Sequence, residues 1–352
     1  MSQFLLTGGE GFIGFHIAKL LLEQGHQVAS YDSNRTWIPS SIGYYHKSKL
    51  IRDEELEGRV QRFLGDTNDQ DRFSEALNEF QPEYVIHLAG LPLAGESNKF
   101  PKDARETILD GTQTVLNCLK QYTKTHSKFR RFTFISSSMV YGDFALDPLG
   151  NPIPAKETDP LNSDKSFYAG FKEMGEIITR TSGHIFHIPY TIVRPSAVYG
   201  PTDCNRRVVE IFIDNALQNT PLVLDNEGTL RVDFTYVQDT AQGIILATTQ
   251  EQGINQTFNI TAGNSRTLEE LAQIIASHIP SVQVQKKKGT DSFRPARGTL
   301  DIAKARKLLG YSPKHSLEKG VKLYLEHVIK HGYVPNISAE VLRGVRGLDL
   351  SR

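Results

Sequence analysis

Short apolar runs alternate with amphipathic segments through the first 200 residues of the chain. Runs with the length of a buried strand occupy residues 4–6, 27–31, 59–66, 84–90 and 131–136, and another lies within 184–193. Segments with helical periodicity separate them at residues 15–22, 71–80, 103–123 and 166–182. This alternation predicts an α/β fold in which a doubly wound parallel sheet carries helices on both faces. Ligands of such sheets bind beyond the carboxyl ends of the strands.

The pattern becomes mixed beyond residue 200. We expect short strands at residues 222–224, 231–237, 257–260 and 282–285, and helices at 207–218, 239–249, 267–278, 302–309 and 317–331. These elements predict a smaller, mixed α/β C-terminal lobe. We assign residues 1–200 plus about 233–262 to the sheet domain, and about 201–232 plus 263–333 to the second lobe. Residues 334–352 would form a loosely attached extension. Its apolar residues Leu342, Val345 and Leu348 could dock on a partner.

A glycine-rich turn joins the first predicted strand to the first predicted helix. Residues 7–14 read Thr-Gly-Gly-Glu-Gly-Phe-Ile-Gly. Gly8, Gly11 and Gly14 have the spacing of a tight turn whose backbone approaches a pyrophosphate. The helix predicted at residues 15–22 would present its free N–H groups to the same anion, and Phe12 and Ile13 of the turn are further candidate cofactor contacts. The strand–turn–helix order therefore predicts a Rossmann-type dinucleotide site.

Polar or small residues follow the other predicted strands of this sheet. Asp32 ends the second strand, at the spacing of a carboxylate that binds the adenosine ribose and repels a 2′-phosphate, so it favours NAD over NADP. Asp66 follows the third strand and is a candidate contact for the adenine. The remaining candidate cofactor contacts at strand ends are Leu88, Ala89, Gly90, Ser136 and Pro195.

The composition narrows the class of protein. The 352 residues are enough for two lobes, and the formal net charge of zero does not favour nucleic acid as a partner. Cys118 and Cys204 have no metal-ligand spacing and suit a reducing compartment. No apolar run is long enough to cross a bilayer, and the N-terminus enters the first strand without room for a signal peptide. We expect a soluble, cytoplasmic protein with no membrane partner and no bound metal.

A tyrosine and a lysine share one face of a predicted helix. Tyr168 and Lys172 are four residues apart, which is about one helical turn. A lysine ammonium close to a phenol lowers the phenol pKa from about 10, so that the tyrosinate can accept a proton from a sugar hydroxyl. The pair follows the serine-rich strand end at residues 136–142, where a serine can hydrogen-bond the reacting oxygen.

Together, these motifs resemble those of the extended short-chain dehydrogenases in the NAD-dependent epimerase/dehydratase family, which mostly act on nucleotide sugars. The resemblance extends over residues 1 to about 333, and its motifs lie at residues 7–14, 87–90, 136–142, 168–172, 194–201 and 233–239. It implies a catalytic triad of Ser137, Tyr168 and Lys172, with Tyr168 as the base. It also implies that Tyr168 and Lys172 contact the NAD cofactor.

Two residues beside the triad serine differ from the dehydratase pattern. In 4,6-dehydratases of the family an Asp-Glu pair follows the triad hydroxyl, and similar sugar-acid decarboxylases usually carry a glutamate there. Ser138 and Met139 occupy these places here, and methionine cannot move a proton. Dehydration and decarboxylation by those routes are disfavoured, whereas 4-epimerisation needs no further acid or base.

Two positions that contact the diphosphate in many nucleotide-sugar relatives also differ. Ala197 replaces an asparagine, and Val232 replaces an arginine. Arg231 is one residue earlier, which on a strand sends its side chain to the opposite face unless a bulge intervenes. Arginine suits phosphate because of its fork of donors, and the other arginines that could supply this contact are Arg206, Arg207, Arg294 and Arg297.

The leading hypothesis is a NAD-dependent epimerase of a nucleoside-diphosphate sugar, which acts through a transient keto sugar while NAD stays tightly bound. The alternatives are a dehydrogenase or reductase of a sugar, sugar acid or other small carbonyl compound, a dehydratase with a non-standard acid/base pair, and a non-catalytic NAD-binding scaffold, against which the complete triad argues. The candidate substrate contacts are Ser138, Met139, Ala197, Arg206, Arg207, Arg231 and Arg297.

The resemblance also implies a homodimer that pairs through the predicted helices at residues 103–123 and 166–182. Ile108, Val115 and Leu119 lie on one face of the first of these helices. They fit either this interface or the core of the subunit.

Overall fold

A parallel sheet of seven strands forms the centre of the larger lobe in the computed structural model, which describes residues 1–37, 44–289, 295–334 and 337–349. The strand order is β11-β6-β5-β4-β1-β2-β3, and every neighbouring pair is parallel. This confirms the predicted doubly wound sheet. The strands are β1 (Gln3–Thr7), β2 (Gln27–Asp32), β3 (Gln61–Leu64), β4 (Tyr84–His87), β5 (Arg131–Ile135), β6 (Tyr190–Pro195) and β11 (Gln256–Ile260).

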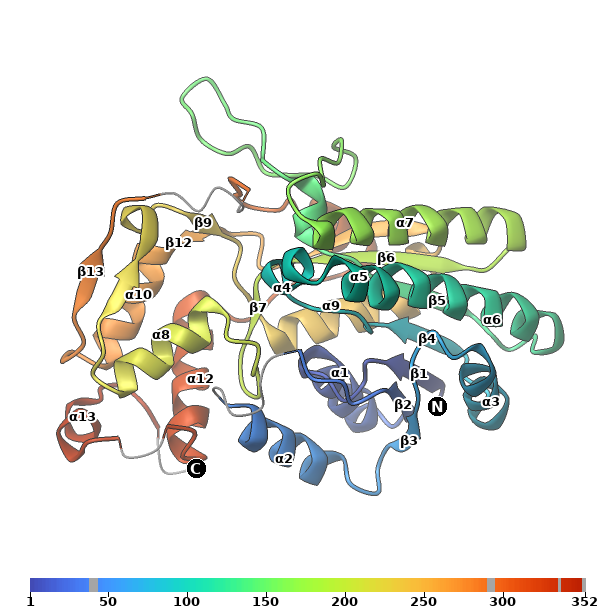
Figure 1. Cartoon of the computed structure of the whole chain (residues 1–352), viewed down its shortest axis with the longest axis horizontal. Helices are drawn as coiled ribbons and strands as arrows, with labels where there is room; N and C mark the ends of the chain where they lie inside the picture. Colours follow the sequence, from blue (N-terminus) through green and yellow to red (C-terminus); the bar gives the residue numbers. More distant parts are fainter. Residues whose placement is uncertain (38–43, 290–294, 335–336, 350–352) are drawn as a thin grey trace.

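Helices cover both faces of the sheet (Figure 1). On one face, α3 (Gln70–Phe80), α6 (Gly111–Thr125) and α7 (Phe167–Phe186) pack on an apolar core, and on the other face α1 (Phe12–Glu23), α9 (Val237–Thr249) and α11 (Ala303–Leu309) do so. Val115 and Leu119 are buried in the first core, and Ile108 is buried against Leu91 and Ala104. These three predicted interface candidates therefore belong to the core of the subunit.

The second lobe consists of short strand pairs and helices around a separate apolar core. Its helices are α8 (Val208–Leu217), α10 (Leu268–His278), α12 (Leu317–Lys330) and α13 (Ala339–Gly344). Its strand pairs are β8 (Leu222–Leu224) with β13 (Val284–Lys286) and β9 (Arg231–Val232) with β12 (Arg266–Thr267). A further pair, β7 (Val198–Tyr199) with β10 (Thr235–Tyr236), packs on the core of this lobe through Tyr199 and Tyr236.

The C-terminal extension docks on its own lobe. Val341 of α13 is buried in the apolar core of the second lobe, and Val345 and Leu348 pack against that core. The backbone nitrogen of Arg346 donates to the carbonyl of His278 at 2.9 Å. The described part of the extension is therefore attached to its own chain, contrary to the expectation of a loose tail that docks on a partner.

The predicted strand at residues 231–237 is interrupted by a buried carboxylate. It divides into β9, which is antiparallel to β12, and β10, which is parallel to β7. Between them, the Asp233 carboxylate accepts hydrogen bonds from the backbone nitrogen of Leu300 at 3.0 Å and from Thr261 Oγ1 at 3.1 Å. Because a buried carboxylate must be hydrogen-bonded, the chain leaves the strand here.

Three helical regions differ from the predicted elements. The helix expected at residues 103–123 is divided into α5 (Pro101–Ala104), a π-helical turn (Arg105–Asp110) and α6. Helix α2 (Tyr45–Leu56) was not predicted, because its buried positions are Ser48, Arg52 and Leu56, and two of these are polar. Helix α4 (Ala94–Lys99) is short and was also missed.

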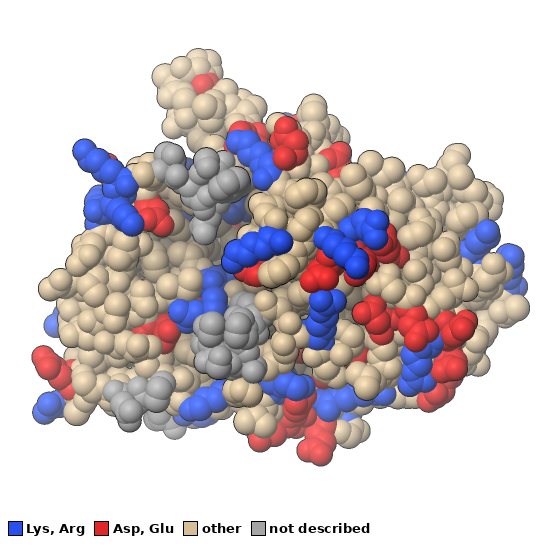
Figure 2. Space-filling model, viewed as in Figure 1, with Lys and Arg blue, Asp and Glu red and all other residues tan. Residues whose placement is uncertain are grey.

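The surface carries no obvious excess of one charge on the face shown in Figure 2, where Lys and Arg side chains are interspersed with Asp and Glu. Among the helices of the described residues, none combines the length and apolar character needed to span a bilayer.

A buried ion pair joins helix α7 to the strand ends. The Glu176 carboxylate on α7 accepts hydrogen bonds from Arg194 Nε at 2.8 Å and Nη2 at 2.7 Å on β6. Ser136 Oγ, directly after β5, donates to the same carboxylate at 2.6 Å. Both members of the pair are buried, and Arg194 Nη1 also donates to the Tyr141 hydroxyl at 2.9 Å. These bonds fix α7 against the carboxyl ends of β5 and β6.

Substitution Arg194→Met should lower the free energy of unfolding by roughly 3 kcal/mol or more, because it leaves the Glu176 carboxylate buried without its bidentate partner. The matched control is Arg180→Met, which removes a 40% exposed side chain 3.1 Å from the same carboxylate. The control should cost less than about 1 kcal/mol. Urea denaturation monitored by circular dichroism measures both, and equal losses would contradict the importance of the buried pair.

Candidate active site

The glycine turn after β1 brings the backbone close to the end of β4. Gly8 has a φ of +70°, and a Cβ there would lie 2.9 Å from the backbone nitrogen of Ala89. A Cβ on Gly14 would lie 2.5 Å from the carbonyl oxygen of Gly8. Gly11 is the N-cap of α1, and because glycine has no side chain it cannot cap the N–H groups of the first helical turn. The turn therefore leaves the N–H groups at the start of α1 available to an anion.

Asp32 lies behind this turn at the end of β2. Its carboxylate accepts hydrogen bonds from the backbone nitrogens of Glu10 at 3.1 Å and Asn34 at 2.8 Å. Burial raises the pKa of Asp32, and these hydrogen bonds oppose the rise. The neighbouring Arg35 is paired with Asp103 at 3.1 Å. This arrangement suits a ribose with free hydroxyls better than one that carries a 2′-phosphate.

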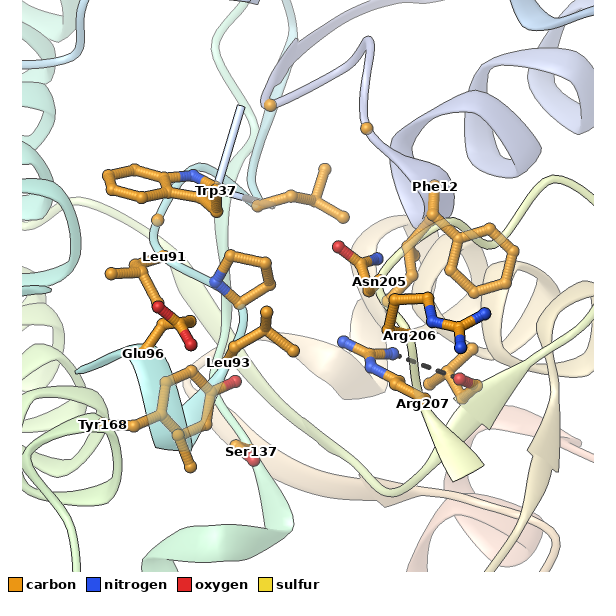
Figure 3. Close-up of a pocket in the computed structure, with 18 of the residues that line it drawn as sticks. Phe12, Trp37, Leu91, Leu93, Glu96, Ser137, Tyr168, Asn205, Arg206 and Arg207 are labelled. Carbon is orange, nitrogen blue, oxygen red and sulfur yellow. Dashed lines mark hydrogen bonds between the residues drawn. The ribbon is translucent and has the colours of Figure 1, made fainter. Parts of the chain in front are cut away.

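A cavity of about 1170 Å³ extends from the glycine turn to the second lobe (Figure 3). Every cofactor contact expected from the sequence lines it, and so do all the candidate substrate contacts except Arg231. Arg294 lies outside the described residues. The structure thus brings most of the candidates into one cavity, while the role of each stays a prediction.

The three residues of the expected triad meet at the carboxyl end of β5. The Ser137 hydroxyl is near enough to the Tyr168 phenol to oppose the rise of its pKa, and it accepts a hydrogen bond from the backbone nitrogen of Met139 at 3.2 Å. Lys172 lies one turn further along α7 and donates to the Ile135 carbonyl at 2.7 Å. The serine, the phenol and the ammonium are thus held by the sheet and by α7.

The sequence predicts that the Lys172 ammonium lowers the pKa of Tyr168, but in the structure other charged groups act in this direction. Burial raises the pKa of Tyr168, and the groups that oppose this rise are the Ser137 hydroxyl and the guanidinium groups of Arg207 and Arg297. The Lys172 ammonium is 6.0 Å from the centre of the phenol ring, and burial lowers the pKa of Lys172 itself to about 8. Two arginines rather than the lysine therefore oppose the rise of the Tyr168 pKa.

The segment before α8 places two arginines on the opposite side of the cavity from Tyr168 (Figure 3). Arg207 is the N-cap of α8 and donates through Nη1 to the Val198 carbonyl at 3.1 Å. Arg206 pairs with Asp214 at 2.9 Å. A helix N-terminus and an adjacent guanidinium form a suitable site for a diphosphate.

Ala197 occupies an unusual backbone conformation in the cavity wall. Its φ is +36°, in the left-handed region that asparagine adopts more readily than alanine. The asparagine that many relatives carry at this position would suit that backbone. Here the conformation is kept without the amide, so any diphosphate contact by a side chain must come from other residues.

Arg231 does not line the cavity. Its guanidinium donates to Ser265, through Nε to the hydroxyl at 3.2 Å and through Nη2 to the carbonyl at 2.7 Å. Its neighbour Val232 lines the cavity, as the alternation of side chains along a strand requires. The one-residue displacement of the arginine is therefore not compensated by a bulge, and we remove Arg231 from the candidate substrate contacts.

Sequence reasoning missed several residues of the cavity wall. Trp37, Leu91 and Leu93 pack with Tyr168 in one apolar cluster. Glu96, on α4, lines the same cavity. Trp37 follows β2 and the other three follow β4, so the only signal for them in the sequence was their position after strand ends.

The NAD dependent epimerase/dehydratase family model matches residues 4–261 of the chain. The chain belongs to this family. It is accordingly an enzyme that uses NAD, and the glycine turn, the uncapped start of α1 and Asp32 fit that cofactor.

Solved structures and curated relatives place both epimerases and dehydratases near this chain. A UDP-glucose 4-epimerase of Thermotoga maritima, solved with UDP-glucose, is 26% identical, with a TM-score of 0.81 over 93% of this chain and 99% of that one. A UDP-glucuronic acid 4-epimerase of Bacillus cereus, solved with UDP-glucuronic acid and NAD, is 27% identical, with a TM-score of 0.78 over 93% and 99% of the two chains. A dTDP-glucose 4,6-dehydratase of Haemophilus influenzae is 25% identical over 92% of this chain and 96% of that protein.

Substitution Gly14→Ala should abolish NAD binding, because the added Cβ would overlap the Gly8 carbonyl and displace the turn. The matched control is Gly95→Ala, since Gly95 also lines the cavity but a Cβ there would meet no atom within 4 Å. The NAD content of the purified variants and calorimetric titration with NAD measure the effect. Unchanged NAD binding by Gly14→Ala would contradict the assignment of the turn.

Proposed function

We propose that the protein is a NAD-dependent epimerase that inverts one carbon, most simply carbon 4, of a nucleoside-diphosphate sugar. The observation that carries the proposal is the position of Ser137 and Tyr168 in a single cavity, with the glycine turn at one side and Arg207 with the start of α8 at the other. A nucleotide sugar held by its diphosphate at α8 would extend its sugar toward the phenol.

Tyr168 is the residue placed to accept the proton of the reacting hydroxyl. The Ser137 hydroxyl orients that oxygen, and Arg207 and Arg297 favour the phenolate against the effect of burial. Lys172 is held by the Ile135 carbonyl, from which position it can donate to the nicotinamide ribose. NAD, when bound, supplies the acceptor and then the donor of one hydride at the same sugar carbon.

Epimerisation also requires that the keto sugar rotates before the hydride returns. Met139 follows Ser138 beside Ser137, and a thioether cannot supply the proton transfer that elimination needs. This feature supports epimerisation over dehydration.

A lyase reaction is the second candidate, because Glu96 lies on the Tyr168 side of the cavity (Figure 3). Its carboxylate is paired with Lys99 at 2.8 Å. In a dehydratase, this residue would have to move a proton in place of the missing Asp-Glu pair. Analysis of the product formed from a nucleotide sugar, described next, separates epimerisation from dehydration.

Incubation of the purified holoenzyme with a panel of nucleoside-diphosphate sugars should give the epimeric sugar without accumulation of NADH. Proton NMR identifies the product, and absorbance follows reduced nicotinamide. NADH formed in a one-to-one ratio with product would contradict epimerisation and support a dehydrogenase. Loss of a sugar hydroxyl would support the lyase.

The control for this panel is Tyr168→Phe, which should lower kcat by about 10²–10⁴-fold through loss of the base. The NAD content of the variant should stay close to that of the wild type. Full activity in this variant would exclude Tyr168 as the base, whatever the product is.

The assembly and the domain division are also proposals. Phe167, Met174, Ile177 and Ile185 are about half exposed along one face of α7, which supports a homodimer that pairs through this helix and α6. Residues 1–200 with about 233–262 would hold NAD, and about 201–232 with 263–333 would hold the substrate, while 334–352 extends the second lobe. The two cysteines are buried, free thiols, in keeping with a cytoplasmic location.

Substitution Met174→Glu together with Ile177→Glu should convert a dimer into a monomer, because two charges would be buried at the paired α7 faces. Light scattering coupled to size-exclusion chromatography measures the mass. The matched control is Leu50→Glu, on the distant helix α2, where the leucine is 59% exposed. A wild-type protein that is already a monomer would contradict the proposed assembly.

A further inference from the structure

A carboxyl group that the proposed mechanism does not use is buried under the start of α8. Glu210 lies in the first turn of that helix, after the N-cap residue Arg207, and its side chain is fully buried. Its Oε2 accepts a hydrogen bond from the backbone nitrogen of Arg206 at 2.7 Å, whereas its Oε1 has no hydrogen-bond partner among the described residues. An ionised carboxylate in such a place is costly, because one oxygen has lost water and gained no donor.

The neighbouring charges do not compensate for this loss. The guanidinium of Arg206 is 3.8 Å from Glu210 Oε1 but 2.9 Å from the carboxylate of Asp214, so it pairs more closely with the latter. Asp203, a second buried acid beside Glu210, accepts hydrogen bonds from the backbone nitrogen of Asn205 at 3.2 Å and from its amide at 3.0 Å. Burial, followed by the charge of Asp203, raises the pKa of Glu210 to about 8. Asp203 has the donors that favour an ionised acid, so the proton of this pair lies on Glu210.

The hydrogen bond to Arg206 explains why an acid is placed here. The backbone of Arg206 has a φ of +50°, in the left-handed region, and both Arg206 and Arg207 line the cavity. An apolar side chain in place of Glu210 would leave the N–H of Arg206 without its acceptor. A neutral carboxyl group supplies that acceptor and adds no negative charge beside the two guanidinium groups.

The charge balance around the anion site depends on this proton. The guanidinium groups near the two buried acids are those of Arg52, Arg206 and Arg207, and the carboxyl groups are those of Asp203, Glu210 and Asp214. With Glu210 ionised, these charges cancel. With Glu210 neutral, one positive charge remains for an anion in the cavity. An ionised carboxylate in the first turn of α8 would also offset the helix dipole that attracts the same anion.

The other titratable groups around Glu210 remain uncharged at neutral pH. They are Tyr44 at the N-cap of α2, Cys204 on the loop before α8, Tyr324 on α12 and Tyr333 after that helix. Burial raises the pKa of each of these groups above its usual value. Glu210 is therefore the group of this cluster whose charge changes between about pH 7 and about pH 9.

We propose that Glu210 is a positioning residue of the diphosphate site, which stays a neutral acid while the anion is bound and weakens the site when it ionises. This inference rests on the proposed function, because it assumes that a diphosphate binds at the start of α8. Glu210 does not line the cavity, so it acts on the ligand through Arg206, Arg207 and the field of the helix. A bound anion holds the proton on Glu210, so that binding and protonation favour each other.

Calorimetric titration of the NAD-loaded enzyme with UDP tests the inference without turnover. The terminal phosphate of UDP titrates at about pH 6, so its charge is nearly constant above about pH 7. The affinity of the wild-type enzyme should fall by about tenfold from about pH 7 to about pH 9, because the pKa of Glu210 is about 8. Titrations in two buffers of different ionisation enthalpy should show that UDP binding takes up protons in this range.

Two isosteric variants identify the group that titrates. Glu210→Gln keeps an acceptor for the N–H of Arg206 but cannot ionise, so its affinity for UDP should match that of the wild type at about pH 7 and change little up to about pH 9. Asp203→Asn keeps the acceptor for Asn205 and removes the neighbouring charge, which lowers the pKa of Glu210, so its affinity should begin to fall at a lower pH. The matched control is Glu23→Gln, an exposed glutamate at the end of α1 outside the cavity, which should follow the wild type.

The inference is overturned if the affinity for UDP does not change with pH, or if it falls equally in the wild type and in Glu210→Gln. A uniform loss of affinity in Glu210→Gln at every pH would also overturn it, since the residue would then have a structural role only. If Glu210→Gln does not fold, an unchanged pH profile in Asp203→Asn has the same consequence.

These results leave the proposed epimerisation intact, because analysis of the products formed from nucleotide sugars tests that reaction separately. Absence of UDP binding by the wild-type enzyme at any pH would instead contradict the diphosphate site at α8, and this inference with it.

Discussion

The buried carboxylate of Glu176 is the constraint on which the active-site geometry depends. It lies one turn beyond Lys172 on α7 and takes hydrogen bonds from the ends of two strands, through Ser136 and Arg194. A displacement of α7 along the sheet would leave two opposite charges buried and unpaired, which costs several kcal/mol. The distance between Tyr168 and Ser137 is thus set by a contact in which neither takes part. Glu176 also opposes the burial that lowers the pKa of Lys172 to about 8.

The second lobe shapes its side of the cavity with irregular backbone. Ala197 and Arg206 have positive φ values and line the cavity, and Thr202 between them is also in the left-handed region. Such conformations are costly for residues other than glycine and persist only where the surrounding structure imposes them. Here the packed core of the lobe and the interruption at Asp233 hold the loops that carry Arg207 and Val232 in the cavity wall.

The sheet and the cofactor turn could be predicted because they depend on local patterns. Apolar runs separated by amphipathic segments indicate a parallel sheet, and the glycine spacing requires no knowledge of distant residues. The alternation of side chains along a strand argued against Arg231 in the cavity, yet Arg231 stayed among the candidate substrate contacts because a bulge could have reversed its direction. By contrast, the buried face of α2 includes Ser48 and Arg52, which no hydrophobic period reveals. The contact of Arg297 with Ser138 joins residues that are 159 positions apart, so no local pattern could predict it.

The position of Trp37 gives the molecule an internal optical probe. It is the only tryptophan of the chain, and it packs in the cluster that includes Tyr168 on the wall of the cavity. Indole emission overlaps the absorption of reduced nicotinamide, so energy transfer from this one side chain would occur only while the bound cofactor carries the hydride. The fluorescence of the unlabelled protein can therefore report whether the bound nicotinamide is oxidised or reduced.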